Sequence, residues 1–259
     1  MQLFASTLVV VVISHQVGFA QPLGADDPLR FLNWPAQDAA SLFQSARGQG
    51  AIAIIGVGAA VYAIAQRDPA LAEAIADASP SPRHPAVRVV EEIGNVRSVR
   101  PAALMLFLGS LASGDTRFQD ASFTALESVI VANLLTNALK SAFGRARPYE
   151  GEGSRRFRPF GGSTSFPSGH SATAFAFTTP WLLYYPHPVT AGLVVLSAGT
   201  ALSRVATNFH WVSDIVAGSS IGFATAYILS RSHMRFSEDL TLEPRVDENG
   251  SGFALVLRP

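Results

Sequence analysis

Otherwise apolar sequence is interrupted by three polar clusters: KSAFGRARP at Lys140–Pro148, PSGH at Pro167–His170 and SRVATNFHWVSD at Ser203–Asp214. In chain order they read Lys-x6-Arg-Pro, Pro-Ser-Gly-His and Ser-Arg-x5-His-x3-Asp, within about 75 of the 259 residues. One such match alone is weak, but three in order are specific. The clusters combine cations, two histidines and a carboxylate, so they indicate a phosphate site.

The first cluster contains the single lysine of the chain, Lys140, among eighteen arginines. A lone lysine in an arginine-rich chain suggests a position that needs a compact ammonium group on a flexible stem. A random surface lysine is the alternative. Arg147 and Arg204 offer planar guanidinium groups that suit the oxygens of a phosphoryl group. Pro148 is expected to end the helix that carries Lys140.

The third cluster places His210 and Asp214 four residues apart. On a helix they share a face, so Asp214 can accept a hydrogen bond from one ring nitrogen of His210. That bond fixes the tautomer and leaves the other nitrogen free to attack an electrophile. The alternative is a helix-surface pair that contributes about 0.2–0.5 kcal/mol.

The second cluster directly precedes an apolar run, so Ser168 is expected to cap a helix. Free amides in the first turn bind anions, and Gly169 lets a phosphate approach the backbone. His170 would then lie beside the anion, where it could protonate a leaving oxygen. An ordinary capped helix with an incidental histidine is the alternative. His15, His187 and His233 have no such neighbours in sequence and receive no role.

Together the clusters resemble the three-part signature of the type 2 phosphatidic acid phosphatase and haloperoxidase superfamily. The resemblance implies a phosphomonoesterase that needs no metal or other cofactor. His210 would attack phosphorus to form a phosphohistidine while Asp214 orients it. His170 would protonate the departing alkoxide and then activate water. The phosphoryl oxygens would be held by Lys140, Arg147, Ser168, Gly169 and Arg204.

The substrate stays open between a lipid phosphate, such as phosphatidate or an isoprenoid diphosphate, and a small soluble phosphomonoester. Two other functions also remain. A vanadium haloperoxidase would hold vanadate in the same pocket, and a noncatalytic envelope bundle would bind lipids or anions without turnover. Residues 140–170 carry six basic side chains against two acidic ones, Glu150 and Glu152. Arg155, Arg156 and Arg158 therefore either attract anionic substrates or form a solvated loop.

Apolar segments of helical pattern predict an all-α fold, a six-helix bundle of the same phosphatase kind with a short C-terminal hairpin or tail. The predicted helices cover 48–66, 101–114, 121–139, 171–186, 188–203 and 211–230. The formal charge is zero, so bulk charge does not indicate a nucleic-acid partner. The chain has no cysteine, which excludes disulfides, structural Cys-zinc sites and thiol catalysis.

Residues 1–20 are expected to be a signal peptide that exports the chain to the periplasm or cell envelope, with a short apolar core at Leu8–Ile13. An uncleaved anchor or a buried N-terminal helix is the alternative. An irregular N-terminal arm follows at 21–50, where three prolines disfavour a helix. The helical phosphatase domain spans 51–232 and a tail spans 233–259, with a hairpin turn at Asn249–Gly250.

Membrane spanning is a separate question, because a span needs about 20 apolar residues. Several predicted helices are shorter, and Glu127 lies within one of them, where lipid tolerates it only if it faces the bundle interior. Export followed by six spans would also leave Lys140 and Arg147 inside the cell. Either the bundle is a soluble or peripheral extracytoplasmic domain, which could contact a membrane surface, or residues 1–20 are not an export signal. The sequence favours the first alternative.

Overall fold

A computed structural model describes residues 30–79, 85–234, 240–247 and 250–257. The proposed signal peptide, His15 and the first part of the arm lie outside these residues. The helices α1 to α9 and the strands β1 and β2 follow one another in this order: α1 (Arg30–Ser45), α2 (Gln49–Ala65), α3 (Asp68–Ala78), α4 (Pro85–Gly94), α5 (Val96–Ser110), α6 (Thr116–Phe143), a 3₁₀ turn η1 (Pro148–Glu150), α7 (Gly169–Tyr184), α8 (Pro188–Ala206), α9 (Val212–His233), β1 (Leu240–Asp247) and β2 (Gly250–Leu257).

The predicted all-α class and the terminal hairpin are confirmed. The helices belong to one compact unit, Pro22–Arg235, and the hairpin belongs to another. In the hairpin, β1 and β2 pair antiparallel from Leu240↔Leu257 to Asp247↔Gly250. The two connecting residues, which include the predicted turn residue Asn249, lie outside the described part of the chain.

The predicted irregular arm is wrong over Arg30–Ser45, which form α1 with Pro35 inside the helix. Tertiary contacts outweigh the cost of that proline. Trp34 is buried, and Arg30 donates to Asp120 of α6 across 2.8 Å. The described residues also contain α3 and α4, where the sequence showed only a polar helical pattern. The bundle therefore has more helices than the six predicted.

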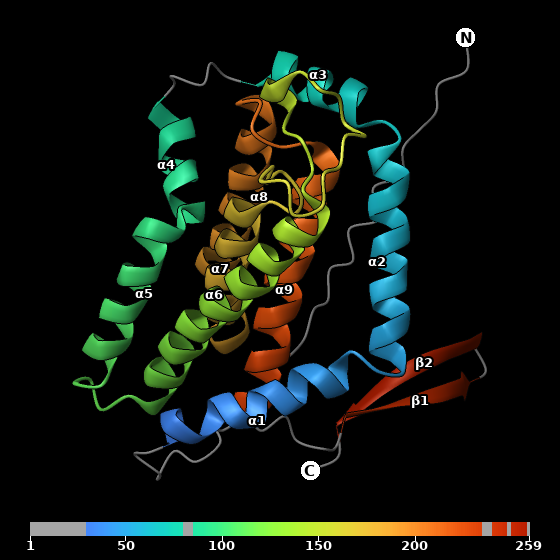
Figure 1. Ribbon diagram of the computed structural model, residues 1–259. Helices are drawn as coiled ribbons and strands as arrows, with labels where there is room; N and C mark the ends of the chain where they lie inside the picture. The colour runs from blue at the N-terminus through green and yellow to red at the C-terminus, as the bar shows by residue number, and fades with distance from the viewer. Residues whose placement is uncertain (1–29, 80–84, 235–239, 248–249, 258–259) are drawn as a thin grey trace. The chain divides into compact units, whose positions relative to one another are not determined.

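Helix α7 lies at the centre of the bundle and packs against α6, α8 and α9 (Figure 1). Two glycines of α9 allow a close approach to α7. A Cβ added at Gly218 would lie 2.2 Å from the carbonyl oxygen of Ser168, and one at Gly222 would lie 2.2 Å from that of Ala172. Alanines also line α7, and Ala172 and Ala176 are fully buried. Small side chains thus bring the first turns of α7 and α9 together.

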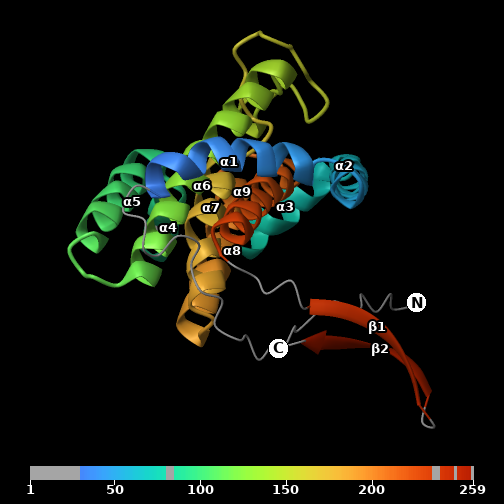
Figure 2. The same ribbon diagram turned by 90° about the horizontal axis from the view of Figure 1, so that it is seen from below.

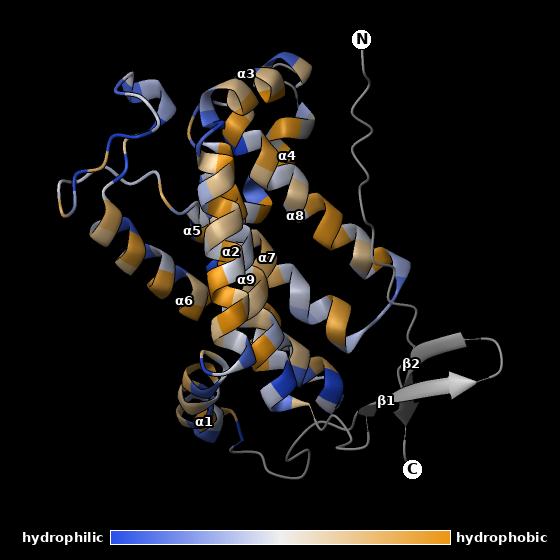
Figure 3. Ribbon diagram, turned by 90° about the vertical axis from the view of Figure 1, so that its right-hand side faces the viewer, coloured by the Kyte–Doolittle hydropathy of each residue, from blue (hydrophilic) through white to orange (hydrophobic). Residues whose placement is uncertain are grey.

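Three of the described helices, α6, α8 and α9, are long and apolar enough to cross a membrane. Helices α1 and α2, bent by 70° at their junction, would be a fourth span if taken together. No residue of α2 is buried, and its exposed side chains include Ile52, Ile55 and Tyr62. Figure 3 shows apolar residues along the length of α2. These findings support the membrane association that the sequence left open beside a soluble bundle.

The two ends of the bundle differ. Helices α6 and α8 end where α7 and α9 begin, so the connections 144–168 and 207–211 meet at one end, together with α3 (Figure 1). Helix α1 crosses the other end, as the view from below shows (Figure 2). Glu127, in the middle of α6, is 8% exposed, which confirms that it faces the interior. All three polar clusters lie at the end that holds the connections.

Candidate active site

The predicted site residues come from four helix ends. Lys140 lies in the last turn of α6 and Arg204 in the last turn of α8. Ser168 caps α7, and Asp214 lies in the first turn of α9. The remaining members lie in the adjoining connections or first turns: Arg147, Gly169, His170 and His210. Four helix termini thus bring together side chains that are up to 74 positions apart, from 140 to 214.

His210 lies in the turn before α9, which begins at Val212, so the prediction that it shares a helix face with Asp214 is wrong in detail. The amides of Phe209 and His210 both donate to the carbonyl oxygen of Arg204, at 3.0 and 3.1 Å. This fold-back places His210 Nδ1 3.5 Å from Asp214 Oδ2. The distance is at the outer limit of a hydrogen bond, and His210 Nδ1 has no closer hydrogen-bond partner among the described residues. Both side chains are buried.

Asp214 is fixed by several donors. Its Oδ2 accepts from Ser165 Oγ at 2.5 Å and from the Trp211 amide at 2.9 Å. Its backbone carbonyl accepts from the Ser168 amide at 2.9 Å, which ties α9 to the start of α7. Because these donors come from both sides, the carboxylate cannot rotate away from His210 without breaking hydrogen bonds.

Arg145, which the sequence analysis left without a role, holds the other oxygen of this carboxylate. Its Nη1 donates to Asp214 Oδ1 at 2.6 Å, and its Nη2 donates to Asp68 Oδ2 of α3 at 2.7 Å. Asp68 also accepts from the amide and the hydroxyl of Ser213. All of these side chains are buried. Local sequence could not separate Arg145 from Arg147, and the partner Asp68 lies 77 positions earlier in the chain.

The three predicted phosphate-binding cations share neighbours. Lys140 and Arg147 both contact Thr164. Arg147 and Arg204 both lie over the Phe209 ring. Lys140 Nζ donates to the carbonyl oxygen of Thr164, and Arg147 Nη2 donates to its hydroxyl at 3.0 Å. Arg204 Nη1 pairs with Glu91 of α4 at 2.6 Å, and its guanidinium carbon lies 4.3 Å from the centre of the Phe209 ring. Arg204 Nε is buried and has no hydrogen-bond partner among the described residues. Such a donor suits a phosphoryl oxygen.

Ser168 caps α7 as predicted. Its Oγ accepts from the Ser171 amide at 3.4 Å and from the Ser171 hydroxyl at 3.0 Å. A Cβ added at Gly169 would lie 3.7 Å from Cε of Lys140, an ordinary contact. The lysine stem therefore passes beside the first turn of α7, where amides without helical partners attract anions.

The two histidines are held in the neutral form. Burial, followed by the nearby charges of Arg204, His210, Lys140 and Arg147, lowers the pKa of His170 to about 3. Burial also lowers the pKa of His210 to about 4, although Asp214 opposes this shift. A neutral His210 retains a lone pair for attack on phosphorus.

The arginines of the 144–168 connection pair locally. Arg158 and Arg156 contact Glu152 at 2.9 and 3.4 Å, and Arg155 donates to Gln66 of the α2–α3 turn at 2.9 Å. These pairs are solvent-exposed, so they contribute little to stability. The solvated-loop alternative describes these three side chains.

Comparison with known proteins agrees with this geometry. Residues 121–238 match the family model described as the PAP2 superfamily. This matched stretch, called the PAP2 segment below, covers slightly less than half of the chain. The PAP2 segment contains every predicted site residue, and it begins after Asp68 and Glu91, the two carboxylates that hold Arg145 and Arg204.

Three known proteins illustrate what the chain is similar to. The chain is 36% identical over 118 residues to the lipid A 1-phosphatase of Rhizobium johnstonii, covering 42% of this chain and 48% of that protein. It is 27% identical over 169 residues to the probable diacylglycerol pyrophosphate phosphatase 1 of Schizosaccharomyces pombe, covering 51% and 60%. A transmembrane PAP2 type phosphatidylglycerolphosphate phosphatase of Bacillus subtilis, known from a crystal structure, is 20% identical, with a TM-score of 0.49 over 68% of this chain and 92% of that chain.

The chain spans about half the length of the two Rhizobium lipid A 1-phosphatases it matches, and 18% of the length of the one from Porphyromonas gingivalis. Within the PAP2 segment, the site offers a neutral imidazole oriented by a carboxylate, a second imidazole and three cations. This set can bind a tetrahedral oxyanion and supply both a nucleophile and a proton carrier.

Proposed function

We propose that the chain is a metal-independent phosphatase that hydrolyses lipid phosphate monoesters through a phosphohistidine intermediate. One observation carries this proposal: buried His210 is neutral, and its Nδ1 faces Asp214. It lies at the end of the bundle that also holds the three cations Lys140, Arg147 and Arg204. A site that only bound anions would need the cations but not an oriented, uncharged imidazole.

In the first step, His210 Nε2 attacks phosphorus and the bond from phosphorus to the ester oxygen breaks. Lys140, Arg147 and Arg204 stabilise the negative charge on the phosphoryl oxygens. The departing alkoxide takes a proton from His170. The two negative charges of the bound ester offset the cations that lower the pKa of His170, so His170 accepts a proton when substrate binds.

In the second step, neutral His170 takes a proton from water, and the oxygen attacks the phosphohistidine. The phosphorus–nitrogen bond breaks, phosphate leaves, and His210 returns to its neutral form. His170 ends this step protonated, as it was in the substrate complex, and it returns that proton when phosphate leaves, so protons balance over one turnover. Asp214 keeps Nδ1 of His210 facing away from phosphorus throughout.

Two observations support a lipid substrate. The relatives are named for lipid A and diacylglycerol pyrophosphate, and α2 together with α6, α8 and α9 carries apolar surface suited to a bilayer. The candidate substrates are a lipid A type 1-phosphate, phosphatidate and an isoprenoid diphosphate. We place the chain in the cell envelope, with the site on the extracytoplasmic side, to which the apolar segment Leu8–Ile13 would direct it.

The test is hydrolysis by detergent-purified protein in EDTA, with p-nitrophenyl phosphate, phosphatidate, an isoprenoid diphosphate and lipid A as substrates. We expect turnover of at least one lipid, lost in His210→Ala and retained in His187→Ala, which changes an exposed histidine. Trapping of acid-labile, base-stable phosphate on the wild type would identify the phosphohistidine. Folded protein that hydrolyses none of these esters would overturn the proposal, and vanadate-dependent halide oxidation or phosphate binding would then identify the alternative.

A further inference from the structure

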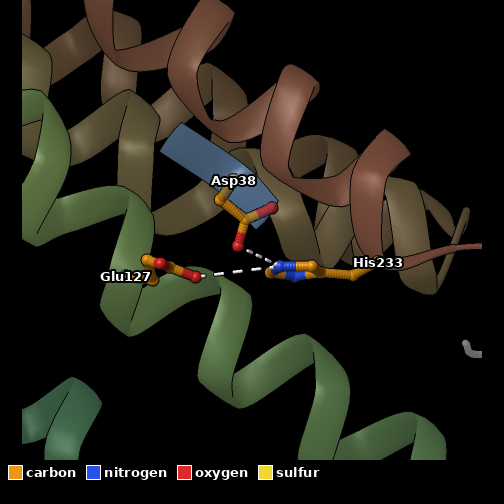
Figure 4. Close-up of side chains that lie close together, drawn as sticks. All are labelled: Asp38, Glu127 and His233. Atoms are coloured by element: carbon orange, nitrogen blue, oxygen red, sulfur yellow. Dashed lines mark hydrogen bonds and ion pairs between the residues drawn. The ribbon is translucent and has the colours of Figure 1, made fainter. Parts of the chain in front are cut away.

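A second polar cluster lies at the end of the bundle opposite the phosphate site. Asp38 of α1, Glu127 of α6 and His233 at the end of α9 point toward one another (Figure 4). His233 Nε2 lies 2.7 Å from Asp38 Oδ2 and 3.7 Å from Glu127 Oε2. One donor atom of each residue lies within 4.8 Å of the other two, and all three residues are buried.

The hydrogen-bond network is compatible with a proton on Nδ1 of His233. Thr124 Oγ1 donates to the carbonyl oxygen of Asp120 at 2.7 Å, and that oxygen can only accept. While its one hydroxyl proton is used there, Thr124 can accept from His233 Nδ1, which is 2.8 Å away. A neutral ring with its proton on Nδ1 carries a lone pair on Nε2, the atom that faces both carboxylates. Histidines that bind metals are usually held by such a bond on the other nitrogen.

Each of the two carboxylates has one oxygen that accepts no hydrogen bond among the described residues. Asp38 Oδ1 and Glu127 Oε2 are buried and have no hydrogen-bond partner among the described residues. Asp38 is 2% exposed and Glu127 is 8% exposed. Figure 4 shows the Glu127 carboxylate directed at the His233 ring. A proton on Nε2 would satisfy one oxygen of Asp38 but would not reach Glu127 Oε2, which lies 3.7 Å away. A divalent cation would balance both carboxylates and accept the nitrogen lone pair.

The spacing and the surroundings also fit an ion. Donor atoms about 2.1 Å from a tetrahedral metal lie about 3.4 Å from one another. The two measured separations, 2.7 and 3.7 Å, lie on either side of that value. The Trp34 ring stacks on His233 at 3.9 Å and covers the cluster on one side. A mixed imidazole and carboxylate set favours first-row transition metals over calcium or magnesium.

We propose that Asp38, Glu127 and His233 bind one divalent first-row transition metal ion that fastens α1 to α6 and α9. The ion is structural, and the proposal does not depend on the phosphatase chemistry at His210. Binding of a metal to the folded chain stabilises the fold in proportion to the logarithm of the free metal concentration.

The experiment measures the metal content and the melting temperature of full-length protein purified through a histidine-free tag. Protein as isolated and protein reloaded with Mn²⁺, Fe²⁺, Co²⁺ or Zn²⁺ after chelation are compared by elemental analysis. We expect about one ion per chain, a melting temperature that rises with added metal, and visible absorption bands from the Co²⁺ form. Glu127→Gln and His233→Gln should lose all three signals.

Glu73→Gln and His187→Gln make the same chemical changes at exposed positions and should behave as the wild type. Circular dichroism separates loss of metal from loss of fold, and Glu127→Gln preserves side-chain shape. A folded wild-type protein without stoichiometric metal or metal-dependent melting would overturn the proposal and leave a proton-linked cluster. Retention of the ion by both Glu127→Gln and His233→Gln would also overturn it.

Discussion

Arg145 donates to Asp214 across 2.6 Å, and both side chains are completely enclosed by the bundle. Asp214 in turn lies 3.5 Å from His210, so the guanidinium group acts on the proposed nucleophile through the carboxylate. Asp68 holds the far side of Arg145 at 2.7 Å. Charges alternate from Asp68 to Arg145 to Asp214, which faces the neutral His210. Asp68 therefore helps to position His210 from outside the PAP2 segment.

Substitutions in this chain of charges should move the pH dependence of the enzyme in opposite directions. Asp214→Asn removes a negative charge beside His210, so the pKa of His210 falls further and the acid limb of kcat/KM moves to lower pH. Arg145→Gln removes a positive charge, so the limb moves to higher pH. Both variants should lose about 100-fold or more in kcat.

Stability measurements distinguish positioning from a general loss of structure. Removal of one partner of a buried ion pair costs about 3–5 kcal/mol of unfolding free energy. If Arg145 acted only on stability, Arg145→Gln that remains folded would keep the wild-type pH profile. Glu152→Gln, which breaks exposed pairs with Arg156 and Arg158, is the matched control and should change neither quantity appreciably.

The pH profile of the wild type follows from the two histidines and the substrate. His210 must be neutral, so kcat/KM should fall as the pH drops through about 4, the pKa of its buried imidazole. The reactive complex must also hold one proton for the leaving oxygen, either on His170 or on the ester. His170 is neutral in the free enzyme and does not supply this proton. The ester must bring that proton, so kcat/KM should fall above about pH 6, the second pKa of a phosphate ester.

An acidic optimum between these limits would be measured from initial rates at subsaturating substrate, corrected for protein stability at each pH. A value of kcat/KM that stays constant from pH 5 to 9 would contradict the proposal that the ester brings the proton for the leaving group. Ionic strength must be held constant across the series, because it changes the attraction between the cationic site and the anionic ester.

Leaving-group dependence tests the role of His170. An alkyl phosphate needs a proton on its departing oxygen, whereas p-nitrophenolate leaves without one. His170→Gln should therefore lower the rate on an alkyl ester by about 10²–10⁴-fold and have a smaller effect on the first step with p-nitrophenyl phosphate. A burst of p-nitrophenol followed by slow turnover is expected, since water activation also uses His170. Equal losses in the first step for both esters would contradict this role.

Much of this site could be predicted from the chain because its parts carry local signals. Ser168 precedes an apolar run and caps α7 as expected, and Lys140 lies near a predicted helix end. The His210–Asp214 spacing brought the pair together although His210 precedes the helix, because a tight turn spans the same four positions. The predicted contact between His210 and Asp214 was therefore correct, although the predicted helical position of His210 was wrong.

Partners from distant segments could not be predicted. Arg204 pairs with Glu91 and His233 pairs with Asp38, and these residues lie 113 and 195 positions apart. Nothing in the local pattern of a polar residue indicates which distant helix it will face. Helix α1 was missed for a related reason, since burial of Trp34 and the Arg30–Asp120 pair stabilise it against the proline in its interior.

The contact between α7 and α9 should be sensitive to a single methyl group. Gly218→Ala places a Cβ 2.2 Å from the carbonyl oxygen of Ser168, so the helices must separate. We expect a loss of about 1–3 kcal/mol in unfolding free energy, together with lower activity because Ser168 and Asp214 move apart. Denaturant unfolding in detergent and phosphatase assays measure the two effects.

Gly192→Ala is the matched control for this contact. A Cβ at Gly192 of α8 meets nothing within 4 Å. Alanine favours the helix over glycine by about 0.5–1 kcal/mol, so this variant should be as stable as the wild type or more so. Equal effects at the two glycines would show that helix propensity, and not the close packing of α7 on α9, decides the outcome.

The orientation of the site can be read from cysteine labelling, because the natural sequence has no cysteine. Phe160→Cys places one thiol in the connection at the phosphate end, where Phe160 is 82% exposed. Ala112→Cys places one at the exposed turn before α6, at the other end. Helix α6 has 28 residues and is about 42 Å long, enough to separate the two thiols by a bilayer.

If the site faces outward, a membrane-impermeant maleimide should label Phe160→Cys in intact cells and Ala112→Cys only after permeabilisation. The reverse pattern would place the phosphate site on the cytoplasmic side and contradict export of the site, without affecting the phosphatase chemistry. Labelling of both thiols in intact cells would show that α6 does not cross a bilayer. That result would support the soluble or peripheral extracytoplasmic bundle that the sequence favoured.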